Sequence, residues 1–323
     1  MNDEQAHAVA VAALAHWGGA RQGPRLIGNR ENAVFKAQLA DGAHVALRLH
    51  RPGYQTDAAI RSELTWMQLL VGSGFRCCTP VPALSGALTT RVGGRMVSAL
   101  SWIDAAPFGV PGVALAGGKA QQVIQFEQLG AIIGRLHTVT DELALPADFV
   151  RPRWDEDGLL GHAPLWGRFW DNPAFAASER SLLLKACENA RLELAEFRRD
   201  GVDFGLIHAD LLRENVLKDA AGLALIDFDD CGFGFRMYDL GVALVQYIDE
   251  PHAPTLSAAL ITGYRGERDL PDHAASRLQM FVMLRAFASC GWIMARSEKG
   301  HESQRWFAQR AVGCAREYLN PCD

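Results

Sequence analysis

The sequence lacks the features that mark membrane-spanning, disulfide-bonded or nucleic-acid-binding proteins. None of its apolar runs is long enough to cross a bilayer. The seven cysteines are scattered and include no C-x-x-C pair, so neither a zinc site nor a disulfide framework is expected. The net charge is −5 without a dense basic block, which argues against nucleic acid as a partner. No internal repeat and no low-complexity tract is present.

The composition is that of a globular protein with a large core. Of the 323 residues, 49% are apolar and 21% are charged, which is typical of a chain folded into two lobes. The first five residues are acidic and polar, unlike a signal peptide. Together with the cysteine pattern, this favours a reducing, cytoplasmic location. The sequence does not indicate the oligomeric state.

Residues 205–217 contain several polar side chains that are suited to catalysis. An apolar strand leads into a polar loop that contains His208, Asp210 and Asn215, and a second apolar strand follows. The frame H-x-D-x-x-x-x-N is the spacing of a kinase catalytic loop. Phosphoryl transfer needs a group near the acceptor hydroxyl and oxygen ligands for Mg²⁺. Asp210 suits the first role, and Asn215 together with Asp227, which ends the next apolar strand, suits the second.

An ordinary turn rich in Asp and Asn is the alternative interpretation of this loop. The coincidence of several parts of the motif set favours the catalytic one. Residues 208–215 followed by Ile226-Asp227-Phe228-Asp229-Asp230 resemble the aminoglycoside phosphotransferase and choline kinase superfamily. The resemblance is closest to homoserine kinase type II and the stress-response kinase branch.

The resemblance extends to residues 238–241. Tyr238-Asp239-Leu240-Gly241 is similar to the start of the family's "DLA" helix, with Asp239 as a structural carboxylate. Ala209 stands where the family more often has glycine, a mild departure if the backbone φ there is negative. The implied fold is α+β and bilobal, like that of protein kinases. It has a small antiparallel-sheet lobe (1–103) and a larger, mostly helical lobe (104–323) that carries the catalytic hairpin.

Periodicity and turn residues predict the elements of both lobes. Asp41-Gly42 predicts a tight hairpin, and Thr56 an N-cap. Expected strands are 25–39, interrupted by a loop at 27–32, and 43–49, 83–90 and 95–101. Expected helices are 3–17, 56–70, 119–138, 179–199, 240–248, 255–264, 273–297 and 303–319.

The smaller lobe contains the expected nucleotide contacts. Gly28 and Asn32 lie in the place of a phosphate-covering loop, although a plain turn is equally compatible with one glycine. Val45 to Arg48 resembles the kinase V-A-I-K strand, so Ala46 would face the purine and Arg48 the phosphates. The alternative is a solvent-facing arginine, in which case Lys36 and Arg51 would supply the cation.

Glu63 borders the buried face of the expected helix 56–70 and would pair with Arg48, or else lie exposed. Ser101 to Ile103 occupies the kinase hinge, where backbone groups would bind adenine.

The larger lobe is expected to hold the acceptor. His137, at the end of a long helix, is interpreted as a structural residue. His208 is expected to support the catalytic loop. The candidate pocket residues are Asp229, Asp230, Tyr264, Arg285 and Trp292, and Asp230 could hold an amine of the acceptor.

The leading functional hypothesis is an ATP- and Mg²⁺-dependent phosphotransferase that acts on a small-molecule alcohol such as an amino alcohol, a hydroxy amino acid or an aminoglycoside-like compound. Two alternatives stay open: a Ser/Thr protein kinase of the stress-response type, and a nucleotide-binding pseudokinase.

Overall fold

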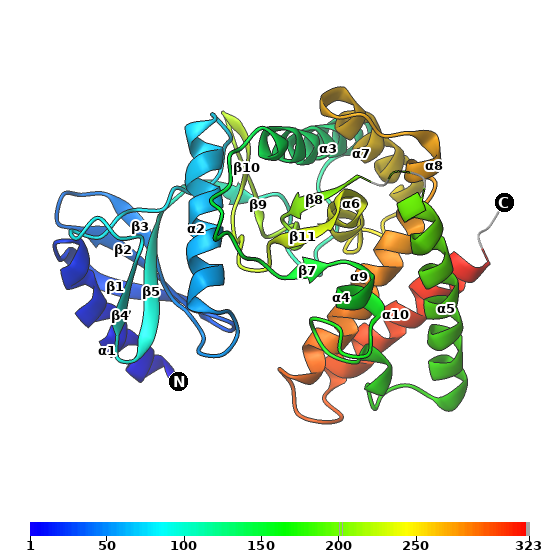
Figure 1. Cartoon of the computed structure of the whole chain (residues 1–323), viewed down its shortest axis with the longest axis horizontal. Coiled ribbons are helices and arrows are strands. Elements are labelled where there is room, and N and C mark those ends of the chain that lie inside the picture. Colours follow the sequence, from blue (N-terminus) through cyan, green and yellow to red (C-terminus); the bar gives the residue numbers. More distant parts are fainter. Residues whose placement is uncertain (200, 202, 321–323) are drawn as a thin grey trace. The chain divides into compact units, whose positions relative to one another are not determined.

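The structure is a computed structural model that describes residues 1–199, 201 and 203–320 (Figure 1). The chain forms two compact units. The first comprises residues 1–106, 143–151 and 217–229, and the second comprises 107–142, 152–216 and 230–323. Two later segments of the chain, including the one that carries Asp227, therefore belong to the first unit. The architecture is the expected α+β fold, with an antiparallel N-terminal sheet and a mostly helical C-terminal part.

The first unit is built on a five-stranded antiparallel sheet of order β1-β2-β3-β5-β4 (Figure 1). Its strands are β1 (Ala20–Asn29), β2 (Ala33–Leu39), β3 (His44–Leu49), β4 (Thr89–Val92) and β5 (Arg95–Ser101). Alternation along β2 buries every second residue, as expected for a strand with one face on a core. The helix α1 (Asp3–Leu14), followed by a 3₁₀ turn (Ala15–Trp17), packs its alanines against Phe35, Leu47 and Leu49.

The second helix of this unit, α2 (Asp57–Gly72), begins where the sequence predicts. The Thr56 hydroxyl accepts a hydrogen bond from the N–H of Ala59, which caps the helix. Ile60, Leu64 and Met67 are buried along its inner stripe. The expected strand 83–90 is shorter in the structure, because β4 starts only at Thr89.

A small three-stranded sheet has the order β10-β9-β6, with β6 at Ala106–Pro107, β9 at Val216–Asp219 and β10 at Gly222–Leu225. Arg76 fastens β9 and β10 to the rest of the first unit. It forms an ion pair with Asp219, and its Nη1 donates to the carbonyl of Gly222 at 2.9 Å. Cys77 and Leu225 form a parallel bridge. The segment 217–229, which contains Asp227 and Asp229, is therefore anchored to the first unit.

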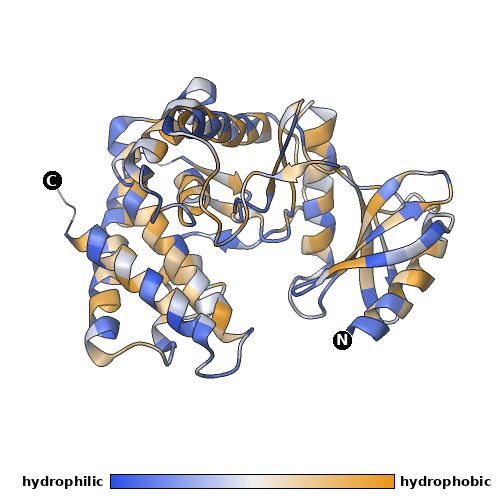
Figure 2. Cartoon of the chain, turned by 180° about the vertical axis from the view of Figure 1, so that it is seen from behind, coloured by the Kyte–Doolittle hydropathy of each residue, from blue (hydrophilic) through white to orange (hydrophobic). Residues whose placement is uncertain are grey.

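The second unit consists mainly of helices, which carry alternating polar and apolar stripes (Figure 2). They are α3 (Lys119–Asp141), α4 (Glu156–Leu160), α5 (Ala177–Arg199), α6 (Arg236–Leu244), α7 (Ala253–Glu267), α8 (Asp272–Ala275), α9 (Leu278–Met294) and α10 (Glu302–Leu319), with a 3₁₀ turn at Phe169–Asp171. The expected helix 273–297 is divided into α8 and α9. All nine residues of α6 are buried, so this helix runs through the core.

A second small sheet, of order β7-β11-β8, corrects one detail of the expected fold. Its strands are β7 (Arg153–Trp154), β11 (Gly232–Phe235) and β8 (Phe204–Ile207). The loop 208–215 therefore joins β8 to β9 of a different sheet, and the two strands do not form a hairpin. Local sequence cannot distinguish these cases, because either partner satisfies the backbone of an apolar strand.

Two further findings concern disulfide bonds and membrane-spanning helices. None of the six described cysteines forms a disulfide bond. In the part of the chain that the structure describes, no helix has the length and apolar character needed to cross a membrane.

Candidate active site

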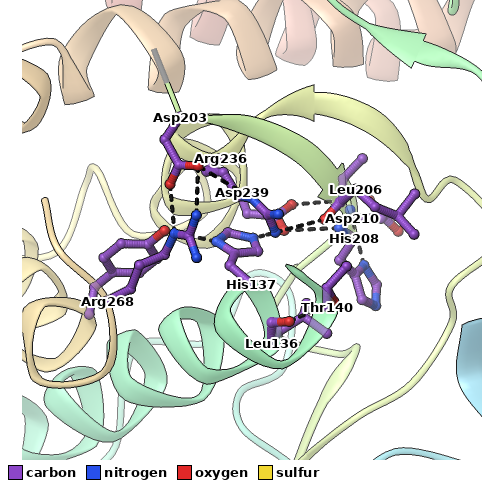
Figure 3. A network of polar contacts seen from close by, with 12 residues as sticks. Leu136, His137, Thr140, Asp203, Leu206, His208, Asp210, Arg236, Asp239 and Arg268 are labelled. Atoms are coloured by element: carbon purple, nitrogen blue, oxygen red, sulfur yellow. Dashed lines mark hydrogen bonds and ion pairs between the residues drawn. The ribbon is translucent and has the colours of Figure 1, made fainter. Parts of the chain in front are cut away.

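One buried carboxylate, that of Asp239, anchors the loop that follows β8 (Figure 3). Asp239, in the first turn of α6, accepts hydrogen bonds from two successive backbone N–H groups. Its Oδ2 accepts from His208 at 2.9 Å, and its Oδ1 accepts from Ala209 at 2.7 Å. Burial opposes the charge of Asp239, but the hydrogen bonds from His137 and the backbone lower the pKa of this carboxyl below its usual value. Asp239 therefore anchors the loop as an anion.

Ala209 departs from the expectation stated for it. Its φ is +64°, in the left-handed region, whereas a mild substitution for glycine required a negative φ. The cause is the pair of bonds to Asp239, which impose this conformation on the backbone. An L-residue costs roughly 1–2 kcal/mol there relative to right-handed geometry, and glycine avoids that cost.

His137 of α3 supports Asp239 and is a structural residue, as the sequence predicts. Its Nε2 lies 3.0 Å from Asp239 Oδ2, and its Nδ1 lies 2.9 Å from the Tyr264 hydroxyl. Because a carboxylate can only accept, the proton of His137 is on Nε2 and the tyrosine donates to Nδ1. Burial lowers the pKa of His137, so the ring is neutral. Tyr264, a candidate pocket residue from sequence, is thus part of this support.

Beyond His137 the network continues into Arg236, Arg268 and Asp203 (Figure 3), and Asp141 pairs with both arginines. Arg236 donates to the carbonyl of Leu206 in β8 at 3.0 Å and forms an ion pair with Asp141. Arg268 binds both carboxylate oxygens of Asp203, at 2.6 and 2.7 Å, and contacts Asp141 at 2.8 Å. These pairs fasten the start of β8 to α3 and α7, and so fix the strand from which the loop emerges.

Asp210 is oriented by two partners in the second unit. Its Oδ1 accepts from Arg285 Nη2 at 2.7 Å, and its Oδ2 accepts from Asn215 Nδ2 at 2.8 Å. The same amide of Asn215 also donates to the Asp210 carbonyl at 2.9 Å. Each carboxylate oxygen keeps further lone pairs, because an ionised carboxylate offers about four acceptor sites. Asp210 can therefore still accept a hydrogen bond from a hydroxyl.

His208 and Asn215 have clear local functions. The Nδ1 of His208 accepts the backbone N–H of Asp210 at 3.2 Å, and His208 is completely buried. This geometry makes it a support of the loop, as the sequence analysis expected. The amide nitrogen of Asn215 is directed at Asp210, so its oxygen is the end suited to binding a metal ion.

The first unit contains the buried cation predicted from the V-A-I-K-like strand. Arg48 forms an ion pair with Glu63 of α2, and its Nη1 lies 3.9 Å from Asp227 Oδ1. Burial disfavours the charge of Arg48, but the carboxylates of Glu63, Asp229 and Asp227 outweigh it and raise the pKa of the guanidinium above its usual value. The alternative of a solvent-facing arginine is excluded, because Arg48 is only 3% exposed.

Asp227 and Asp229 differ sharply in exposure although only one residue separates them. The side chain of Asp227 is 52% exposed, and its backbone has a φ of +64°. Asp229 is buried, and its Oδ2 accepts from Asn32 Nδ2 at 3.1 Å. Burial, reinforced by the charge of Glu63, raises the pKa of Asp229 to about 6. The acceptor contact expected for Asp229 stays a prediction.

The expected phosphate-covering loop is a tight turn in the structure. Gly28 and Asn29 are still in β1, where they pair with Val34 and Ala33 of β2. The Oδ1 of Asn32 accepts the backbone N–H of Arg51, so this side chain links the turn to Asp229 and to the end of β3. Only residues 30–32 are left to form a loop.

Two backbone N–H groups of the expected hinge, residues 101–103, already donate to carbonyls of other segments. The N–H of Ser101 donates to the Thr79 carbonyl at 2.7 Å, and that of Trp102 donates to the His44 carbonyl at 2.9 Å. Both N–H groups are therefore engaged, which leaves Ile103 as the better candidate for adenine recognition. Lys36, a fallback cation from sequence, lies with its Nζ 4.3 Å from the centre of the Trp102 ring.

Two contacts of the site were not predicted from sequence. Arg285 was expected only as a pocket residue, and its bond to Asp210 was not foreseen. Arg151 donates to the backbone carbonyls of Asp229 and Ala59, at 2.5 and 3.0 Å, and was missed entirely. A usable signal existed for Arg285, because it is the single charged residue within the apolar helix α9. Trp292, another expected pocket residue, contacts Phe307 and Arg296 instead.

These features define a kinase-like phosphotransferase, and comparison with known proteins identifies its family. Residues 23–277 match the model of the phosphotransferase enzyme family, and the chain belongs to this family. It transfers phosphate to an alcohol group of a small molecule.

Individual relatives agree with this assignment. An amicoumacin kinase of Bacillus subtilis is 24% identical and covers 79% of this chain and 72% of its own. A homoserine kinase of Xanthobacter autotrophicus is 28% identical, with coverages of 74% and 70%. The solved structure of a microcompartment-associated aminopropanol kinase superposes with a TM-score of 0.82 at 31% identity, and 97% of each chain is covered.

Proposed function

We propose that this protein phosphorylates the hydroxyl group of a small amino alcohol. Two of the similar proteins are named for acceptors that carry both an amine and a hydroxyl, aminopropanol and homoserine. The structural observation that carries the proposal is the environment of Arg285. Asp210 and Asp230, both in the second unit, act electrostatically on this one guanidinium. Asp210 would accept the hydroxyl of the acceptor, and Asp230 would bind its ammonium group.

Asp210 has the properties that an acceptor-orienting group needs. Its carboxylate is fixed at both oxygens and remains 16% exposed. In the proposed reaction the acceptor oxygen forms a bond to the γ-phosphorus of ATP. The bond between that phosphorus and the β,γ-bridging oxygen breaks, ADP leaves, and the hydroxyl proton passes to Asp210. Correct placement of the hydroxyl is the main contribution of the protein, because the phosphoryl group itself requires little covalent assistance.

The remaining residues are assigned to the nucleotide and the metal ion. We propose that Arg48, braced by Glu63, interacts with the phosphates, that Ala46 faces the purine, and that Ile103 binds the adenine edge through its backbone. Gly28 and Asn32 would contribute the turn near the phosphates.

Asn215 and Asp227 offer the hard oxygen donors that Mg²⁺ prefers, and phosphates and waters would complete the coordination. When bound, Mg²⁺ neutralises negative charge on the β- and γ-phosphates. Because the donor is ATP, we propose the cytoplasm as the compartment.

The test is ADP release from ATP and Mg²⁺ across a panel of short amino alcohols, hydroxy amino acids, aminoglycosides, simple alcohols and a generic protein acceptor. We expect turnover with amino alcohols and a loss on the order of 10²-fold or more in Asp210→Asn. Chelation of the metal with EDTA should abolish turnover, and Mg²⁺ should restore it.

Asp230→Asn tests the recognition of the amine. It should raise KM for an amino alcohol and leave unchanged the weak activity towards the same alcohol without the amine. Asp57→Asn, a partly exposed carboxylate of the first unit, is the control and should change neither value. Equal turnover of the amine-free alcohol by the wild type would contradict the proposed acceptor class. Turnover of the protein acceptor alone would favour the protein-kinase alternative, and ATP binding without any turnover would favour the pseudokinase.

A further inference from the structure

Arg285 is a buried cation in an otherwise apolar helix. It is the single charged residue of α9 and is 3% exposed. Taking a guanidinium out of water is costly, and an apolar side chain of similar size at such a position is often neutral or stabilising. The energetics of packing therefore do not account for an arginine here. Its contacts show what the charge is used for.

The guanidinium is directed at the acceptor-orienting loop. Nη2 donates to Asp210 Oδ1 at 2.7 Å, and Nη1 donates to the carbonyl of Ala209 at 3.1 Å. One planar group thus binds the side chain of Asp210 and the backbone just before it. A planar fork of this kind fixes direction as well as distance, which a lysine ammonium does not do.

The opposite side of Arg285 is closed by aromatic rings. Its Cζ lies 4.5 Å from the centre of the Trp166 ring, a cation–π contact. Trp154 packs edge-on against Trp166, with ring centres 5.0 Å apart, and stacks on Tyr238 at 5.4 Å. The indole N–H of Trp154 donates to the Asp230 carbonyl at 2.8 Å. These rings leave Arg285 little freedom to swing away from Asp210.

A glycine on α9 permits this arrangement. A Cβ at Gly291 would lie 2.8 Å from the carbonyl oxygen of Trp166 and 2.7 Å from that of Gly167, so any larger residue would push the loop off the helix. The backbone that carries Trp166 thus rests directly on the helix that carries Arg285. Trp166 therefore covers the buried guanidinium of Arg285.

We infer that Arg285, held by Trp166, is a positioning residue that orients Asp210 for phosphoryl transfer. The inference rests on the proposed role of Asp210. It goes beyond the acceptor class, because it applies to any alcohol that Asp210 orients. The charged and titratable groups around Asp210 are Arg285 from α9, Tyr238 from α6, Asp230 before β11, and His208 within the loop. Among them Arg285 supplies the positive charge, since His208 is completely buried and accepts a backbone N–H through Nδ1.

The chain offers a matched control for this arginine. Arg236 is equally buried, at 2% exposure. It donates to the carbonyl of Leu206, in the strand that leads into the loop, and forms an ion pair with Asp141. Both arginines therefore combine a backbone carbonyl with aspartate partners, which are Asp141 and Asp203 for Arg236. Only Arg285 contacts Asp210.

The experiment compares Arg285→Gln, Arg285→Lys and Arg236→Gln with the wild type. The measurements are kcat and KM, ATP affinity by calorimetry, and crystal structures of the variants. Arg285→Gln should lower kcat on the order of 10²-fold, the loss expected when a reacting group is misplaced by about 1 Å. The Asp210 carboxylate should lose its wild-type orientation in the crystal structure, while ATP affinity stays unchanged.

The other two variants separate charge from geometry. Arg285→Lys keeps the charge without the fork, so it should restore only part of kcat. Arg236→Gln should lower thermal stability but leave the orientation of Asp210 as in the wild type. If Arg285→Gln does not fold, Arg285→Lys and Trp166→Ala provide the same comparison, and the latter should reproduce the loss of kcat.

The inference is overturned if Asp210 keeps its orientation without Arg285. It is equally overturned if Arg236→Gln displaces the Asp210 carboxylate to the same extent. The crystal structures need no acceptor, so they test the positioning even if amino alcohols are not phosphorylated. In that case the proposed acceptor class fails while the inference on Arg285 is decided independently.

Discussion

The carboxylate of Asp239 holds the backbone of Ala209 in a left-handed conformation. Asp239 Oδ1 accepts the Ala209 N–H at 2.7 Å, and the φ of Ala209 is +64°. This turn places Asp210 beyond the buried network, where Arg285 and Asn215 bind its two oxygens. The loop is therefore shaped by contacts from α6 and α9 that are distant in sequence.

Ala209→Gly should stabilise the protein. Glycine adopts positive φ without steric cost, although it is more flexible in the unfolded chain, so we expect a net gain of a few tenths to about 1 kcal/mol. Chemical denaturation of the two proteins measures the difference. Ala209→Val is the contrasting variant and should be destabilised, because a β-branched residue fits this region poorly. A glycine variant less stable than the wild type would contradict the account given for the loop.

Asp239→Asn should be strongly destabilising. The amide places a donor where His137 and two backbone N–H groups also donate, and breaking a buried charged network of this kind typically costs about 3–5 kcal/mol. The denaturant midpoint should fall accordingly, and turnover should drop with the loss of loop geometry. Asp269→Asn, an exposed carboxylate of the same unit, should stay within about 0.5 kcal/mol of the wild type. Similar losses in both variants would show that Asp239 does not anchor the loop.

Glu63→Gln should weaken ATP binding. Arg48 would lose its ion-pair partner in a buried position, and its guanidinium would no longer be held in place. We expect a rise in the Kd for ATP on the order of tenfold, measured by calorimetry, together with a lower melting temperature. Asp57→Asn is the control, because its pair with Arg91 is exposed and such pairs contribute about 1 kcal/mol or less. Unchanged ATP affinity in Glu63→Gln would separate Arg48 from the nucleotide.

Asp229 should make stability depend on pH in an unusual direction. Its pKa is raised from 3.8 to about 6 in the folded state. A raised carboxyl pKa contributes stability that is fully present below pH 3.8 and is lost as pH rises through 6. The upper bound of this contribution is roughly 3 kcal/mol, at 1.36 kcal/mol for each pKa unit.

The measurement for Asp229 is denaturation of the wild type and Asp229→Asn at pH 5 and pH 7.5. The variant should gain stability relative to the wild type at the higher pH. His50 and His137, whose pKa values are lowered by burial, change stability in the opposite direction but equally in both proteins. A difference between the two proteins that is independent of pH would show that Asp229 is not the group responsible.

Much of the fold could be predicted from local patterns. The hairpin at Asp41-Gly42, the cap at Thr56 and the buried stripe of α2 all follow from short-range spacing, and the structure contains each of them. The pairing of Arg48 with Glu63 was also predictable, because a strand cation and a helix carboxylate have a fixed relation in kinase-like folds. The split of residues 273–297 into α8 and α9, by contrast, has no strong breaker to signal it.

The sequence by itself determined which residues are proposed to carry the chemistry. The spacing of His208, Asp210 and Asn215, followed by Asp227, follows from the order of residues along the chain, and it placed this protein among the phosphotransferases. Only the tertiary structure decided how these groups are held. Arg285 reaches Asp210 across 75 residues of sequence, Asp229 is buried while Asp227 is exposed, and β8 and β9 lie in different sheets. The physical reason is that burial, strand partner and backbone strain depend on elements packed from distant parts of the chain, which periodicity and spacing cannot specify.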